Sequence, residues 1–158
     1  MSEAKLNGRL CSAASFVRQG AVVADIGTDH GYLPIFLLKA ARIERAYLSD
    51  VNAGPLSSAE RNVASEGLSD RCSFMLTDGA AALAGKGITD YAICGMGGEL
   101  IASILAASDY VKNPAVRLIL QPMSHPEKLR SYLAKEGFRT VGGTMAKAQD
   151  KLYQCIVC

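Results

Sequence analysis

Short apolar runs alternate with longer amphipathic segments along this chain. The apolar runs have the length of buried strands and end near glycine or aspartate, and they predict strands at residues 21–26, 45–50, 72–77, 91–94 and 116–121. The longer segments predict helices at residues 4–18, 32–41, 53–66, 97–107 and 127–136. Pro34 and Pro55 fall in first turns, where a helix tolerates proline, and Asn52 is placed to cap the third helix.

The order of these elements predicts the fold class. Strands that alternate with helices form βαβ units around a parallel sheet. The tail differs, because residues 139–145 and 151–157 both read as strands and only a short polar turn at Gln149-Asp150 lies near their junction. So short a connection requires an antiparallel hairpin. We therefore expect a doubly wound α/β domain with a mostly parallel seven-stranded sheet and a terminal antiparallel hairpin.

Composition narrows the class of protein. With 158 residues, 49% hydrophobic and 20% charged, the chain suits one soluble domain with its own core. A net charge of +2 means that any nucleic-acid binding must come from a local patch. No apolar run approaches the length of a membrane span, and the first residues lack the apolar core of a signal peptide. We expect a cytoplasmic protein.

The five cysteines are an odd number, and they are scattered among apolar neighbours. They are expected to be buried free thiols in a reducing compartment. The pair Cys155-x-x-Cys158 has no second pair and no nearby histidine, so we interpret it as structural and predict no metal site.

The segment with the richest chemistry follows the first predicted strand. It reads Asp-x-Gly-x-Asp-x-Gly from Asp25 to Gly31, a strand, a tight turn and a helix start. Asp29 stands where a dinucleotide fold needs a small residue beside the pyrophosphate. A carboxylate repels phosphates and attracts a sulfonium or ammonium cation, so the loop favours S-adenosylmethionine over NAD. The alternative is an ordinary turn that uses aspartate as turn former. The expected cofactor contacts here are Asp25, Gly27, Thr28, His30 and Gly31.

Two further acids end the next strands. Asp50, followed by Val51, lies 25 positions after Asp25, near the offset at which an acid binds ribose hydroxyls in nucleotide-binding sheets. Asp78, followed by Gly79, could accept a hydrogen bond from the adenine amino group, although an ordinary turn explains it equally well. All four residues are assigned to the cofactor.

A glycine-rich string, Gly95-Met96-Gly97-Gly98, leaves the fourth strand and opens a helix. It would place bare backbone at the sheet edge where such folds bind ligands. The Asn/Asp-Pro-Pro-aromatic turn common in enzymes that methylate exocyclic amines is absent, which favours a ring nitrogen as acceptor. We assign Gly95 to the cofactor and the following residues to the acceptor, with the fifth-strand end as a further border: Met96, Gly97, Gly98, Gln121 and Pro122.

These strings resemble the bacterial tRNA (adenine(22)-N1)-methyltransferases. The similarity lies in Asp-His-Gly-Tyr-Leu-Pro at residues 29–34, in Cys-Gly-Met-Gly-Gly at 94–98 and in Leu-Ile-Leu-Gln-Pro at 118–122. The resemblance implies a Rossmann-like class I methyltransferase domain that uses S-adenosylmethionine and acts on tRNA. It places Asp25, Gly27 and Asp29 at the methionine end of the cofactor, Asp50 at the ribose and Asp78 at the adenine.

In that interpretation Asp29 is the candidate catalytic residue, because it could accept the N6 proton or offset the positive charge that develops on the methylated ring. Basic residues of the first helix, Lys5, Arg9 and Arg18, are where phosphate contacts are expected. Family members are expected to be longer, with a C-terminal helical segment that this chain lacks. Open alternatives are another nucleobase, a small-molecule acceptor, or a cofactor-binding module that needs a partner. The sequence leaves the oligomeric state open.

Overall fold

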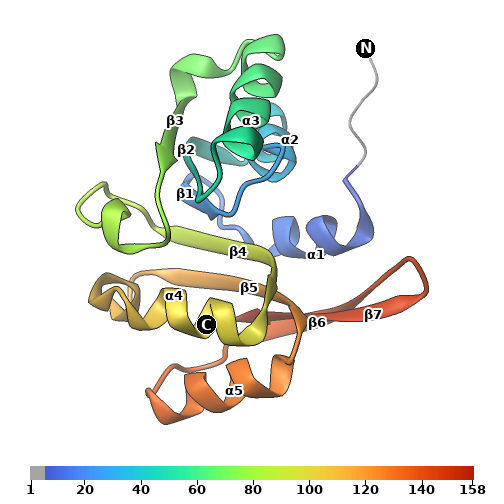
Figure 1. The fold of residues 1–158 in the computed structure, drawn as a ribbon, viewed down its shortest axis with the longest axis vertical. Helices are drawn as coiled ribbons and strands as arrows, with labels where there is room; N and C mark the ends of the chain where they lie inside the picture. Colours follow the sequence, from blue (N-terminus) through green and yellow to red (C-terminus); the bar gives the residue numbers. More distant parts are fainter. Residues whose placement is uncertain (1–5) are drawn as a thin grey trace.

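The predicted strands form one sheet in the computed structural model, which describes residues 6–158 (Figure 1). The strands are β1 (Ala21–Ile26), β2 (Ile43–Asp50), β3 (Cys72–Leu76), β4 (Asp90–Gly97), β5 (Arg117–Ser124), β6 (Gly142–Ala148) and β7 (Lys151–Val157). Their order across the sheet is β3-β2-β1-β4-β5-β7-β6. Strands β1 to β5 are parallel, and β7 pairs antiparallel with β5 and with β6. The predicted seven-stranded Rossmann-like sheet with its terminal hairpin is confirmed.

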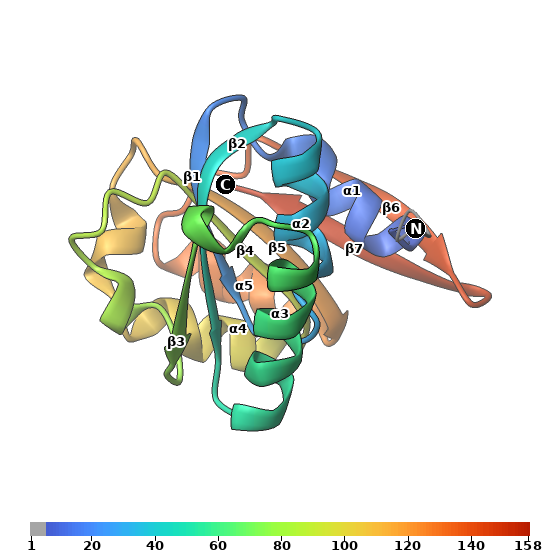
Figure 2. The same ribbon diagram turned by 90° about the horizontal axis from the view of Figure 1, so that it is seen from above.

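Helices cover both faces of this sheet (Figures 1 and 2). They are α1 (Gly8–Phe16), α2 (Tyr32–Lys39), α3 (Ala53–Ser65), α4 (Gly98–Ala106) and α5 (Pro126–Lys135), with short 3-10 turns at η1 (Ser69–Arg71), η2 (Ala81–Leu83) and η3 (Asp109–Lys112). One apolar cluster joins α1, α2 and α3 to one face, and a second joins α4 and α5 to the other. Burial of these two clusters fixes which side chains of each strand face which helices.

Several boundaries differ from the sequence prediction. The glycines after Cys94 were expected to end β4, but the strand continues to Gly97, and β5 continues to Ser124 beside it. The ladder between them shifts register around Met96, so an irregular pairing replaces the predicted loop. The predicted start of the first helix at residue 4 lies outside the described residues.

Two local expectations need correction. Asn52 occupies the N-cap position of α3, but its side chain makes no capping hydrogen bond. Its backbone N–H instead donates to the carboxylate of Asp50 at 2.9 Å, so the turn is held from the strand side. The cysteines are free thiols as expected, but two of them are not buried: Cys11 is exposed on α1, and Cys158 is only partly buried.

Within residues 6–158, no helix has the length and apolar character that a membrane span requires. The same part of the chain also contains no group of three or more His, Cys, Asp and Glu side chains arranged to hold a metal ion.

Candidate active site

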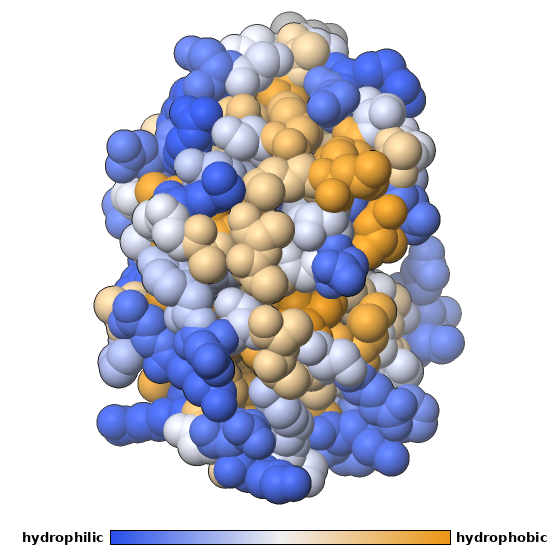
Figure 3. Space-filling model, turned by 60° about the vertical axis from the view of Figure 1, so that its left-hand side comes forward, coloured by the Kyte–Doolittle hydropathy of each residue, from blue (hydrophilic) through white to orange (hydrophobic). Residues whose placement is uncertain are grey.

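A cavity of about 720 Å³ opens at the carboxyl ends of β1, β2 and β4, with α1 along one side. This volume lies in the range of small-molecule and cofactor sites, and the position is the edge at which parallel α/β sheets bind ligands. Its rim includes exposed apolar side chains, Val51, Leu100 and Met123. Figure 3 shows hydrophobic groups gathered on one face of the molecule between hydrophilic margins.

The loop between β1 and α2 forms one wall of the cavity and is held in a tight, left-handed path. Gly27, Asp29 and Gly31 all have positive φ, at 72°, 55° and 75°. The N–H groups of Gly27 and Thr28 both donate to the carbonyl of Ser49 on β2, at 2.9 and 3.0 Å. Aspartate tolerates this conformation better than most residues. The loop is therefore anchored to the neighbouring strand by its backbone, which leaves its side chains available to the cavity.

Asp25 lies at the bottom of this loop and is 4% exposed. The hydroxyl of Thr28 donates to its Oδ2 at 2.7 Å. Burial raises the pKa of Asp25 to about 6, because a low-dielectric surrounding disfavours the charged form. The Thr28 hydrogen bond opposes this rise, the Asp50 charge adds to it, and Arg9 opposes it. A cation placed beside Asp25 would relieve the cost of its charge.

Asp50 connects the two loops that flank the cavity. Its Oδ1 accepts the N–H of Asn52 at 2.9 Å, and its Oδ2 accepts the N–H of Asp29 at 3.4 Å. The carboxylate is 8% exposed, yet it lines the cavity. Each carboxylate oxygen has a second lone pair, so Asp50 can still accept hydrogen bonds from a ligand such as a diol.

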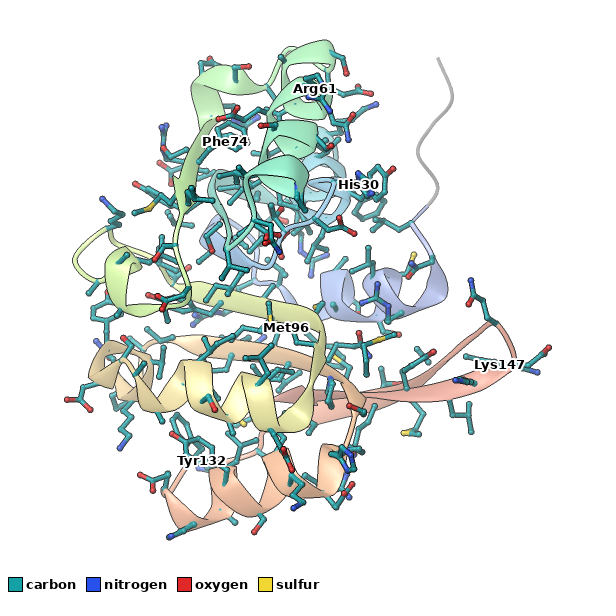
Figure 4. The ribbon with its side chains drawn as sticks, viewed as in Figure 1. His30, Arg61, Phe74, Met96, Tyr132 and Lys147 are labelled. Carbon is teal, nitrogen blue, oxygen red and sulfur yellow. The ribbon has the colours of Figure 1, made fainter. Side chains whose placement is uncertain are left out.

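The outer part of the loop carries Asp29 and His30, whose side chains are 70% and 46% exposed. His30 Nε2 lies 3.5 Å from Asp29 Oδ1, and the His30 ring stacks on Tyr32 with ring centroids 5.2 Å apart. Figure 4 labels His30 on this side of the molecule and Met96 at the end of β4. Asp29 is thus accessible at the mouth of the cavity, whereas Asp25 is enclosed at its base.

Ten of the residues proposed from sequence line the cavity: Asp25, Gly27, Thr28, Asp29, His30, Asp50, Val51, Asp78, Gly95 and Met96. The other six lie outside its lining: Gly31, Gly79, Gly97, Gly98, Gln121 and Pro122.

Packing explains why three of these outlying glycines have no side chain. A Cβ on Gly98 would overlap the carbonyl of His125, and one on Gly97 would lie 3.1 Å from Ser124 Oγ. A Cβ on Gly31 would press against Ala59 of α3. The segments around Gly97 and His125 approach each other closely, and only glycine fits between them. A glycine-rich string therefore arises here from packing, although it resembles one that binds a ligand.

Some lining residues were not found by sequence reasoning. Asn7, Arg9 and Leu10 come from the N-cap and first turn of α1, Cys94 comes from β4 and Leu100 from α4. Arg9 was expected from sequence to contact phosphates and was not assigned to the cavity, which it lines. No local pattern marks the α1 positions, because only the tertiary fold brings α1 beside β4, β5 and the hairpin.

The charge of the cavity is mainly negative. Four carboxylates line it, from Asp25, Asp29, Asp50 and Asp78, and Arg9 is the only lysine or arginine among the described lining residues. Such a surface attracts a cationic ligand and repels a pyrophosphate. The geometry thus disfavours NAD and favours a ligand that carries positive charge together with hydroxyl groups.

Comparison with known proteins identifies the class of protein to which this fold and cavity belong. A family model described as a methyltransferase domain matches residues 6–156. The chain therefore belongs to the methyltransferase domain family.

One relative is the tRNA (adenine(22)-N(1))-methyltransferase of Bacillus subtilis, 37% identical over 158 residues, which are 99% of this chain and 66% of that protein. A crystal structure of Streptococcus pneumoniae Sp1610, a proposed tRNA (m1A22) methyltransferase, superimposes with a TM-score of 0.91 at 39% identity, covering 97% of this chain and 69% of that one. The same protein in complex with S-adenosyl-L-methionine gives 0.90 at 39% identity, covering 97% and 72%. The chain thus spans about two thirds of these relatives, and the family resemblance seen in the sequence motifs is confirmed.

Proposed function

We propose that this chain is the catalytic domain of an S-adenosylmethionine-dependent methyltransferase that modifies N1 of adenine 22 in tRNA. One observation carries the cofactor assignment: a cavity at the ends of β1, β2 and β4 that is lined by four carboxylates and one guanidinium. The tRNA acceptor is supported by relatives described as tRNA methyltransferases. A bacterial tRNA substrate would place the enzyme in the cytoplasm.

The cavity fits this cofactor. Asp25, buried and raised in pKa, would gain from a nearby sulfonium or ammonium charge. Asp50, with free lone pairs beside its two backbone contacts, would accept the ribose hydroxyls. Asp78 at the end of β3 would accept from the adenine amino group. Gly27 lines the same cavity, and its missing Cβ leaves room for the Met96 methyl group. When bound, S-adenosylmethionine supplies an electrophilic methyl group.

The remaining chemistry belongs to the protein and the acceptor. Adenine N1 has its own lone pair, so holding the base in line contributes most of the rate. Asp29 lies exposed at the mouth, where it can accept the N6 proton after transfer or offset the positive charge on the ring. The base has to leave its stack to reach the cavity, and the stacked rings of His30 and Tyr32 offer a planar surface there.

The test is incubation of the protein with tRNA and S-adenosylmethionine labelled in its methyl group, followed by mass analysis of the nucleosides. We expect labelled 1-methyladenosine from a transcript with adenine at position 22, and none from the matched transcript with guanine there. Label in a different nucleoside would overturn the acceptor assignment. Calorimetry tests the cofactor separately: NAD binding as strongly as S-adenosylmethionine would overturn that part.

A further inference from the structure

Arg9 is a cation inside an acidic cavity, and its position requires an explanation. It comes from α1, is half-buried, and lines the cavity. Its Nη1 donates to Oε1 of Gln121, a side chain on β5 that is 1% exposed, at 2.8 Å. The two residues are 112 positions apart in the chain. A buried amide that accepts from a guanidinium makes a charge-assisted hydrogen bond with a fixed direction.

The amide of Gln121 is already occupied by the protein. Its Oε1 also accepts the backbone N–H of Gly95 at 3.3 Å, and its Nε2 donates to the carbonyl of Pro122 at 3.1 Å. A side chain that is buried and bonded in this way is not available to bind a substrate directly. Its contacts instead connect α1, β4 and β5.

Gly95 is where β4 departs from regular pairing. It has φ of +81°, and the register between β4 and β5 shifts between Cys94 and Met96. Such an irregularity re-aims the side chain that follows. Here Met96 is directed across the cavity, because a Cβ added to Gly27 would overlap the Met96 methyl group. A Cβ on Gly95 would itself lie 3.3 Å from Arg9 Nη1.

Resting on the proposed function, we infer that Arg9 and Gln121 are a positioning pair for methyl transfer. Gln121 holds the Gly95 amide, and Arg9 orients Gln121 from α1. Together they fix Gly95 and Met96, the wall of the cavity that faces the loop between β1 and α2. Arg9 is bonded to Gln121 on β5, and its charge also reaches Asp25 at the base of the cavity, where it opposes the rise in pKa. Because Gln121 is outside the cavity lining, the pair acts on methyl transfer through the positions of Gly95 and Met96, which do line the cavity.

The test compares Arg9→Met and Gln121→Leu, singly and together. We expect kcat at saturating tRNA and cofactor to fall roughly 10- to 100-fold in each, as for a small misplacement of reacting groups. The double variant should be no worse than the poorer single one, because the two residues act as one unit. The Kd for S-adenosylmethionine should change less than threefold. Arg61→Met is the matched control; Arg61 lies exposed on α3, outside the cavity lining (Figure 4), and its loss should leave kcat unchanged.

A second readout is independent of turnover. The Gly95 amide proton should shift in the NMR spectrum and exchange faster with solvent in both single variants, because its hydrogen bond is loosened. Arg9→Lys tests geometry against charge: it keeps the charge but loses the planar fork, so it should recover less than half of the lost kcat.

Three results would overturn the inference. Arg9 would be a plain phosphate contact if Arg9→Met raised only the KM for tRNA, with Gln121→Leu normal and Arg9→Lys fully active. The pair would be merely structural if both variants lowered the melting temperature and left kcat and the Gly95 resonance unchanged. Additive losses in the double variant would also refute it. If the wild-type protein methylates no tRNA, the proposed function fails alone, and the Gly95 resonance still decides whether the pair holds the wall.

Discussion

Asp25 offers a prediction in which stability and cofactor binding should move in opposite directions. Asp25 is 4% exposed, and burial raises its pKa from 3.8 to about 6. A carboxyl whose folded pKa lies above its unfolded value holds its proton more tightly in the folded state. Its contribution to stability is then fully present below the unfolded pKa and is lost as pH rises through the folded pKa.

The change to test is Asp25→Asn, which keeps the shape and an oxygen that can accept from the Thr28 hydroxyl, now 2.7 Å from Asp25. The shift in pKa from 3.8 to about 6 is worth about 3 kcal/mol, at 1.36 kcal/mol for each unit. Without cofactor, the variant should therefore exceed the wild type in free energy of unfolding by up to about 3 kcal/mol above pH 6. The difference should shrink between pH 6 and pH 4 and vanish below that.

The difference is measured by urea unfolding of both proteins without cofactor, at intervals from pH 4 to pH 8. Because the two proteins share all other titratable groups, the effects of those groups cancel in the difference. Calorimetry measures the affinity for the cofactor, which should change in the opposite direction to stability. Cofactor affinity of the wild type should weaken as pH falls below about 6, whereas that of Asp25→Asn should be lower throughout and vary less with pH, because the variant has no charge to lose. A variant that is less stable than the wild type at pH 8, or whose cofactor affinity matches it there, would refute the reasoning.

Three further predictions follow from the same geometry. Asp50→Ala should weaken binding of S-adenosylmethionine about 10- to 100-fold by calorimetry, because a charged acceptor is worth about 1.5–3 kcal/mol; unchanged affinity would remove Asp50 from the site. Asp29→Asn should lower turnover on tRNA about 10²-fold at saturating cofactor, while a rate that saturating cofactor restores would show that Asp29 only binds the ligand. Gly98→Ala should lower the free energy of unfolding by about 1–3 kcal/mol, since its methyl group would overlap the His125 carbonyl; equal urea midpoints would contradict that packing role.

The sequence predicted the elements of the fold well because local pattern decides them. Strand β1 was placed at residues 21–26 as observed, and the hairpin turn at Gln149 and Asp150 does have positive φ at both residues. The end of β4 was missed because its glycines serve two structural purposes. Within residues 95–98, Gly95 allows a register shift and Gly98 allows a close contact with the His125 carbonyl. The hydrophobic pattern of the sequence does not distinguish these packing roles from a role in ligand binding.

The carboxylates at the strand ends of the cavity could be predicted because strand topology places them. Asp25 and Asp50 lie in the last positions of β1 and β2, and Asp78 comes just after β3. The topology of parallel sheets brings these carboxyl ends together. Arg9 has no such marker, since its place depends on how α1 packs beside β4, β5 and the hairpin.

This contrast suggests a division within the site. Carboxylates at strand ends are positioned by the sheet itself, so they suit the part of the reaction that every methyltransferase of this fold shares, the binding of the cofactor. The wall around Gly95 is held by side chains from α1 and β5 that are distant in sequence. Contacts of that kind can change between relatives without disturbing the sheet. We therefore expect the Arg9–Gln121 pair, and not the strand-end acids, to govern which acceptor is aligned. Exchange of α1 between two relatives with different acceptors should alter kcat for tRNA while leaving cofactor affinity nearly constant, and a change confined to cofactor affinity would show that this division is wrong.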